Sequence, residues 1–199
     1  MTFVRRARLA LGGFAVASVL ALSAMTPAHA TFEAGVQAYL NGQYTQALDI
    51  WRRFAVAGDV RSKKILGDVY SGKSLEGARS AATPLEAIPV DNVQALVWYS
   101  LAAHHDFSTY QTPSAEEVNA RILAEQRLPE IRARMSTSNV AKAEKLVAQT
   151  FEAGSAYDLY RLGDMYQKGA GIAKNNTKAL QMYTLAQARG VGEASAACL

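Results

Sequence analysis

Cysteine is almost absent from this chain of 199 residues, because Cys198 is the only one. A single cysteine cannot close a disulfide within one chain, so no disulfide framework can hold the fold together. We interpret Cys198 as a small apolar residue of a terminal helix, and an intermolecular disulfide is the alternative. The stability of the fold must come from a hydrophobic core.

A surplus of positive charge is also missing once the N-terminal segment, residues 1–30, is set aside. The whole chain has 21 Lys and Arg against 17 Asp and Glu. The N-terminal segment holds three arginines (Arg5, Arg6 and Arg8) and no acidic residue, so subtracting 3 from 21 leaves 18 basic against 17 acidic side chains. A nearly neutral chain lacks the basic stripe of nucleic-acid binders, so we expect no nucleic-acid partner.

Catalytic signatures and strand patterns are lacking too. The sequence contains no G-x-S-x-G motif, and its carboxylates are scattered. His104, His105 and Asp106 are adjacent, but no further ligand type stands at metal-binding spacing beside them. We therefore expect no catalytic residue, no metal site and no cofactor. Apolar residues recur every three or four positions, which predicts an all-α protein.

The N-terminal segment, residues 1–30, is typical of an export signal. It combines a basic start, an apolar run over residues 9–24, and Ala28 and Ala30 in A-x-A spacing. The apolar run is too short for a membrane span. We expect cleavage after Ala30, a periplasmic or secreted location, and no membrane span after cleavage.

What the chain does contain is an internal repeat. LGDVY begins at Leu66 and LGDMY at Leu162, while ALDIWRRFA, ALVWYSLAA and ALQMYTLAQ begin at Ala47, Ala95 and Ala179. Each unit predicts a helical hairpin, with L-G-x-x-Y in its first helix and aromatic residues in its second. We interpret the aromatic residues of the second helices as core packing: Trp51, Trp98, Tyr99 and Tyr183.

Glycines recur at fixed places in these units. Gly67 and Gly163 lie beside the leucine of L-G-x-x-Y, where a missing side chain lets the partner helix approach, so we expect them to be packing glycines. Gly58, Gly154 and Gly190 follow helices, and we expect each to form a left-handed cap.

The helical assignment also decides the meaning of GDVYSGKS, residues 67–74, which satisfies the nucleotide-binding pattern G-x-x-x-x-G-K-[ST]. That site requires a strand before the loop and a helix after it. Here Gly67 is expected inside a helix and Lys73 at its end. We interpret the match as a coincidence and expect no nucleotide.

The repeats resemble the Sel1-like repeat family, a branch of the tetratricopeptide-like α-solenoids. Residues 160–190 follow the family pattern L-G-x-x-Y-x-x-G-x-G-[VI]-x-x-[DN]-x-x-K-A-x-x-x-Y-x-x-A-x-x-x-G almost throughout, with Asn175 for the usual Asp and Met182 for the usual Trp. The resemblance implies a single α-solenoid domain over residues 31–199. We assign repeat copies to 31–58, 59–106 and 154–190, inserted helices to 107–153 and a terminal stub to 191–199.

Periodicity and capping residues predict eight helices. They lie near residues 32–41, 44–57, 59–72, 91–105, 114–128, 137–151, 155–168 and 175–189. A capping box at Ser114 starts the fifth helix; Pro129 is expected to interrupt it, with a short helix continuing to Met135 as an option. Residues 74–89 are expected to form an irregular exposed loop.

The resemblance implies a non-enzymatic adaptor or regulator. In this hypothesis a concave surface of first helices is offered to a partner protein or peptide, such as part of an envelope complex. The alternative is a cell-envelope enzyme or accessory factor that acts on or binds peptidoglycan. Our partner-binding residues lie on a stripe away from Leu66 and Tyr70, with equivalents around the second L-G-x-x-Y motif: Arg61, Lys64, Asp68, Tyr157, Tyr160 and Asp164.

Overall fold

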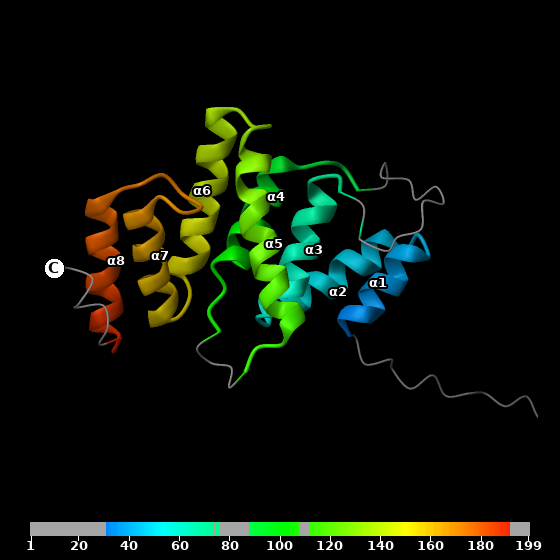
Figure 1. Cartoon of the computed structure of the whole chain (residues 1–199), viewed down its shortest axis with the longest axis horizontal. Coiled ribbons are helices and arrows are strands. Elements are labelled where there is room, and N and C mark those ends of the chain that lie inside the picture. Colours follow the sequence, from blue (N-terminus) through cyan, green and yellow to red (C-terminus); the bar gives the residue numbers. More distant parts are fainter. Residues whose placement is uncertain (1–30, 74, 76–87, 108–111, 192–199) are drawn as a thin grey trace, which may run out of the picture.

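Eight α-helices arranged along one long axis make up the described part of the molecule (Figure 1). The structure, a computed structural model, describes residues 31–73, 75, 88–107 and 112–191, and no strand occurs in these ranges. The N-terminal segment, residues 1–30, Ser74, most of the following loop and Cys198 lie outside the described residues, and so does the predicted export signal. The helices are α1 (Phe32–Leu40), α2 (Tyr44–Val56), α3 (Val60–Tyr70), α4 (Asn92–Ala103), α5 (Ala115–Arg132), α6 (Thr137–Glu152), α7 (Ala156–Lys168) and α8 (Asn176–Ala188).

All eight predicted helices are confirmed, and only the end of the fifth differs from its prediction by more than two residues. The starts were predictable because at every helix except α2 a side chain at the N-cap accepts an amide hydrogen bond. Ser114 and Glu117 form the predicted capping box, and Ser155 and Asp158 form a second one. Along the axis in Figure 1, α1 and α2 occupy one end and α7 and α8 the other.

The expected interruption at Pro129 is wrong. Helix α5 continues through this proline to Arg132. Proline lacks an amide hydrogen, but its carbonyl still accepts a bond from the amide of Ala133 at 3.1 Å. Leu128 and Ile131 on either side are 7% and 2% exposed, so burial of the last turn offsets the one lost hydrogen bond.

The two helices of each repeated pair pack closely where glycine meets an aromatic ring. A β-carbon added to Gly67 would lie 2.5 Å from the ring of Tyr99, and one added to Gly163 would lie 2.6 Å from the ring of Tyr183. Both residues are therefore confirmed as packing glycines. The α1–α2 pair repeats the contact with Gly35 and Trp51, at 2.4 Å.

All four aromatic residues named from the sequence pack in the core or against it. Trp51 and Tyr99 are fully buried and Tyr183 is 2% exposed. Trp98 is partly buried: it packs against the core and also lines a cleft at the surface.

Two of the three expected left-handed glycine caps are confirmed. Gly58 and Gly190 have φ values of 107° and 100°. Gly154 does not adopt a positive φ. Its missing side chain instead leaves room for the capping carboxylate of Asp158, whose Oδ2 would lie 2.4 Å from an added β-carbon.

The stretch GDVYSGKS is a helix and its C-terminal cap. Helix α3 ends at Tyr70, and the amides of Gly72 and Lys73 donate to the carbonyls of Val69 and Asp68 at 3.1 and 2.9 Å. Lys73 forms an ion pair with Glu130 at 3.0 Å. These amides are engaged by the helix, which supports the interpretation of the nucleotide motif as a coincidence.

The two described hydrophobic residues of the predicted 74–89 loop are not exposed. Leu75 and Ile88 are each 7% exposed and belong to the core, so the expectation of an exposed loop is wrong at both positions.

Among the described helices, none combines the length and the apolar character that a membrane span requires.

We predict that Gly67→Val and Gly163→Val each lower the free energy of unfolding by about 1–3 kcal/mol, because the new side chain must displace a buried tyrosine ring. Urea denaturation checks this. Ala188→Val, on the exposed face of α8, is the control and should change stability by less than about 0.7 kcal/mol. Equal effects of the three substitutions would contradict close packing at the glycines.

Candidate functional site

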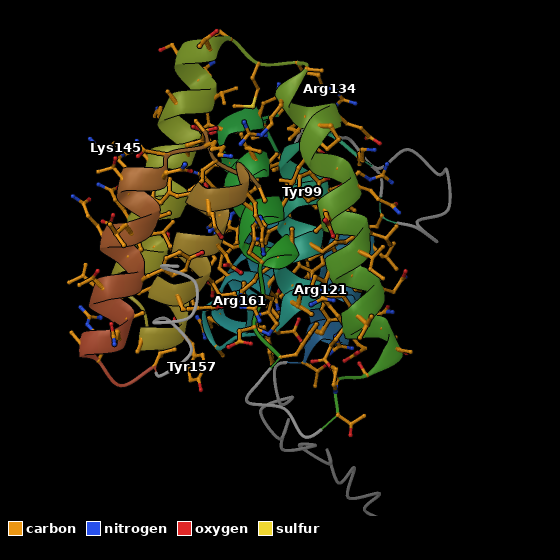
Figure 2. The ribbon with its side chains drawn as sticks, turned by 60° about the vertical axis from the view of Figure 1, so that its left-hand side comes forward. Tyr99, Arg121, Arg134, Lys145, Tyr157 and Arg161 are labelled. Atoms are coloured by element: carbon orange, nitrogen blue, oxygen red, sulfur yellow. The ribbon has the colours of Figure 1, made fainter. Side chains whose placement is uncertain are left out.

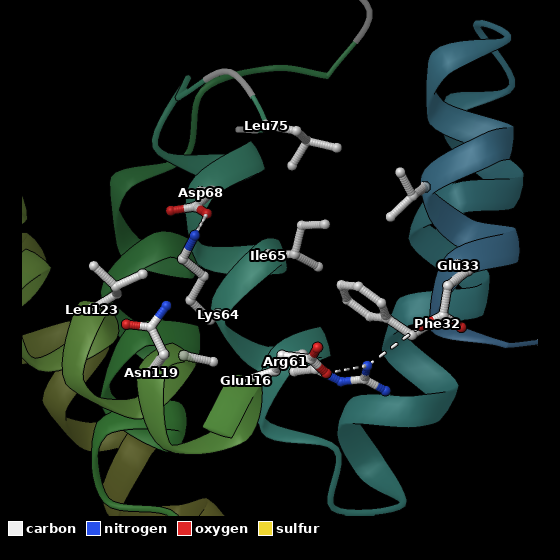
Figure 3. A pocket seen from close by; sticks show the side chains of 12 residues that line it. Phe32, Glu33, Arg61, Lys64, Ile65, Asp68, Leu75, Glu116, Asn119 and Leu123 are labelled. Atoms are coloured by element: carbon white, nitrogen blue, oxygen red, sulfur yellow. Dashed lines mark hydrogen bonds and ion pairs between the residues drawn. The ribbon is translucent and has the colours of Figure 1, made fainter. Parts of the chain in front are cut away.

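A groove bordered by α1, α3 and the first half of α5 is the candidate site (Figure 3). We call it the α3 groove; its volume is about 380 Å³. Its apolar lining is Phe32, Val36, Ile65, Leu75, Ala120 and Leu123. Its polar lining is Glu33, Arg61, Lys64, Asp68, Glu116 and Asn119. Three of the six residues named from the sequence therefore converge here.

Arg61 ties the three sides of the α3 groove together. Its guanidinium lies 3.2 Å from Asp59, 3.4 Å from Glu33 and 3.8 Å from Glu116. It also lies over the ring of Phe32, 4.6 Å from the centroid. Three carboxylates compensate this one cation, and the side chains of Glu33 and Glu116 are 67% and 79% exposed. The accessible rim of the groove is therefore acidic.

Asp68 is buried, with 4% of its surface exposed. Its carboxylate accepts a hydrogen bond from the hydroxyl of Tyr99 at 2.8 Å and pairs with Lys64 at 2.6 Å. Burial, followed by the nearby Asp68 charge, raises the pKa of Tyr99. Asp68, predicted to be a partner-binding residue, therefore presents little surface to a partner, because its carboxylate pairs the tyrosine hydroxyl inside the helix pair.

The three corresponding residues of α7 do not join the α3 groove. Figure 1 shows α6 between α7 and the α3–α5 region. Tyr157 is 48% exposed, and Figure 2 shows it at the margin of α7. Tyr160 packs against Tyr183, with 5.4 Å between ring centroids. Asp164 accepts a hydrogen bond of 2.7 Å from the Tyr183 hydroxyl. Tyr157 alone of these three is open to a partner without disturbing the helix pair.

Sequence reasoning missed the contributions of α1 and α5 to the groove. Phe32 of α1 and Glu116 and Asn119 of α5 belong to no repeated motif. The packing of α5 against α3 brings Glu116 and Asn119 to the groove, and Phe32 reaches it from α1, beneath the guanidinium of Arg61. A signal did exist for the carboxylates. An aspartate follows the packing glycine in both LGDVY and LGDMY, and each second helix carries a tyrosine to pair with it.

His104 and His105 lie at the end of α4 beside a second cleft, which also contains Trp98 and Lys63. Burial, followed by the charge of Arg161 for His104 and of Lys63 for His105, lowers the pKa of each imidazole to about 4. The ammonium of Lys63 lies 3.1 Å from Nδ1 of His105, and burial lowers the pKa of Lys63. Within the described residues, no cluster of three His, Cys, Asp or Glu side chains could hold a metal ion.

Helical hairpins stacked along an axis, each locked by a repeated glycine–aromatic contact, define a helical repeat protein of the α-solenoid class. The family model for the Sel1 repeat matches residues 85–107, which include α4, and residues 156–191, which include the α7–α8 pair. Residues 85–107 and 156–191 are thus Sel1-like repeats. Such repeats generally mediate protein–protein interaction and are typically non-enzymatic. No curated protein and no solved structure matches the chain.

We predict that Asp68→Ala destabilises the protein by about 1–3 kcal/mol, because it removes the carboxylate that pairs the Lys64 ammonium and accepts from the buried Tyr99 hydroxyl, which keeps only Ser71 as a partner. Tyr157→Ala should stay within about 0.5 kcal/mol of the wild type, since its ring is half exposed. Thermal melting of both variants checks the contrast. An unchanged melting temperature in Asp68→Ala would show that this carboxylate does not stabilise the fold.

We also predict that stability falls as the pH drops from 6.5 toward 4. In this window the unfolded chain takes up a proton on His104 that the folded protein does not. Each such group lowers stability by up to about 1.4 kcal/mol per pH unit. His105 contributes to the slope in the same way, so His104→Gln should reduce the dependence measured by urea denaturation between pH 7 and about pH 5 without abolishing it. An unchanged slope would mean that the folded protein already protonates His104 near its usual pKa.

Proposed function

We propose that this protein is a non-enzymatic interaction module that binds a segment of a partner protein in the α3 groove. The single observation that carries the proposal is the convergence of Arg61, Lys64 and Asp68 on a solvent-open, largely apolar hollow of about 380 Å³. A hollow of this size takes one or two apolar side chains of a partner, and its polar rim can orient the partner backbone.

The charges of the groove support a passive binding function. Arg61 and Lys64 are already paired with carboxylates, so neither is held ready as an acid, base or nucleophile. Asp68 is engaged by Tyr99 and Lys64. A partner would therefore gain mainly from burying apolar surface against Phe32, Ile65 and Leu123, with the acidic rim favouring a basic flank.

We further propose that the module acts in the periplasm or outside the cell as an adaptor or regulator. The support is the sequence of the N-terminal segment, residues 1–30, which has the charge pattern, apolar run and small-residue spacing of an export signal. An envelope complex is the kind of partner that such a location offers. No observation in the structure favours the peptidoglycan alternative over this proposal.

We predict that Asn119→Trp abolishes partner capture without lowering stability. Asn119 is exposed and lines the α3 groove, so an indole there fills the hollow while the core stays intact. Asn139→Trp, at an exposed position on α6, is the matched control. The measurement is affinity capture from a periplasmic extract with both variants and the wild type.

Three outcomes are informative. Loss of the same captured protein with Asn119→Trp alone, at an unchanged melting temperature, supports the α3 groove as the site. Equal capture by all three proteins contradicts it. Sedimentation of the wild type with purified peptidoglycan, lost in Asn119→Trp, would replace the protein partner by a cell-wall ligand.

A further inference from the structure

A second groove of opposite character lies at the other end of the solenoid, between α6, the α7–α8 connection and the start of α8. Its volume is about 470 Å³. One face of α6 contributes Ala141, Lys145 and Ala148, and the opposite wall contributes Lys174 and Lys178. We call it the lysine groove. Figure 2 shows Lys145 at the outer edge of the molecule.

The α7–α8 connection that forms one wall is firmly held. Ile172 is 2% exposed, and the guanidinium of Arg132 donates to the carbonyl of Gly171. The amide of Asn175 donates to the carbonyl of Tyr166 at 2.8 Å. The position of Lys174 therefore follows from an anchored backbone, so this wall is formed before any ligand arrives.

The charges of the lysine groove are not balanced. Glu144 is neutralised by Arg132 at 2.8 Å, which leaves Glu152 against three lysines. Among the described residues, no carboxylate lies within 4.0 Å of the ammonium of Lys145, Lys174 or Lys178; the ammonium of Lys178 lies 5.2 Å from the ring centroid of Tyr166. This contrasts with the α3 groove, where Arg61 and Lys64 are each paired. The positive end of the α8 dipole, at its Asn175 cap, borders the same hollow.

We propose that the lysine groove binds an acidic polypeptide segment, in which two or three Asp or Glu side chains pair with Lys145, Lys174 and Lys178. The segment lies along α6, where the small side chains of Ala141 and Ala148 leave room for its backbone. An anionic lipid bilayer suits this groove less well than a peptide does, because the lysines border a hollow that a flat surface cannot enter. This site is separate from the α3 groove, so it stands or falls independently of the proposed function.

The test is fluorescence anisotropy with a labelled synthetic peptide of alternating Glu and Ala, using the mature full-length protein. A peptide with Gln in place of each Glu is the ligand control. The test variant is Lys145→Gln/Lys174→Gln/Lys178→Gln, and all three positions are exposed. The matched control is Arg53→Gln/Arg134→Gln/Lys168→Gln, which changes the net charge equally at exposed positions outside the groove.

We expect the Glu peptide to bind the wild type and the control variant, and to bind the test variant about tenfold more weakly. Individual exposed ion pairs contribute little, but three are removed together. Binding should weaken as salt is added, because the contacts are screened. Charge reversal of the three lysines to Glu should transfer binding to a Lys peptide, which a merely damaged fold could not do.

Equal loss of affinity in the test and control variants would overturn the proposal, since only net charge would then matter. Absence of binding to the wild type would overturn it as well. Vesicles containing an anionic phospholipid provide a third arm. If the wild type sediments with them, the test variant does not, and neither binds the peptide, the groove recognises a lipid surface instead of an acidic segment.

Discussion

Close contact between a glycine of one helix and an aromatic ring of the next is the constraint on which the rest of this structure depends. With the β-carbon position only 2.4 to 2.6 Å from the ring in all three pairs, no other residue fits without moving the helices apart. In two pairs the adjacent aspartate also accepts the tyrosine hydroxyl, so the contact is fixed in direction as well as in distance. The rigidity of each hairpin lets neighbouring hairpins stack, since one hairpin alone cannot bury its apolar face.

The same contact places the groove residues of α3. The hydroxyl of Tyr99 donates a hydrogen bond to Asp68, and Asp68 forms an ion pair with Lys64. The polar wall of the α3 groove is therefore coupled to the core of the α3–α4 pair. The Asp68 side chain is 6% exposed and that of Asp164 is 26% exposed, although both accept the corresponding tyrosine hydroxyl. The lysine partner differs as well: Lys64 lies one turn before its aspartate, and Lys168 one turn after. Equivalent positions of a repeat thus share a core function and differ at their outer ends.

Helix positions could be predicted from the sequence because they depend on local signals, namely apolar periodicity and capping side chains such as Ser114 and Ser155. The packing of Gly67 and Gly163 was predictable for a related reason, since the motif recurs together with an aromatic second helix. The burial of Asp68 and the shape of the α3 groove were not predictable in this way. Both depend on where α5 docks, and no repeated pattern specifies that docking. The passage of α5 through Pro129 likewise reflects tertiary burial of the last turn overriding a local preference.

The helices between the repeats, α5 and α6, supply much of the lining of both grooves. Helix α5 supplies four of the residues that line the α3 groove, and α6 supplies one whole wall of the lysine groove. The repeated pairs provide rigid surfaces, α3 in one case and the α7–α8 connection in the other, against which the insertion closes. Helices α5 and α6 both pack on α4. If both grooves bind partners, α5 would contact one ligand and α6 the other, which gives an adaptor its simplest geometry: two sites of opposite charge on one short, stiff body.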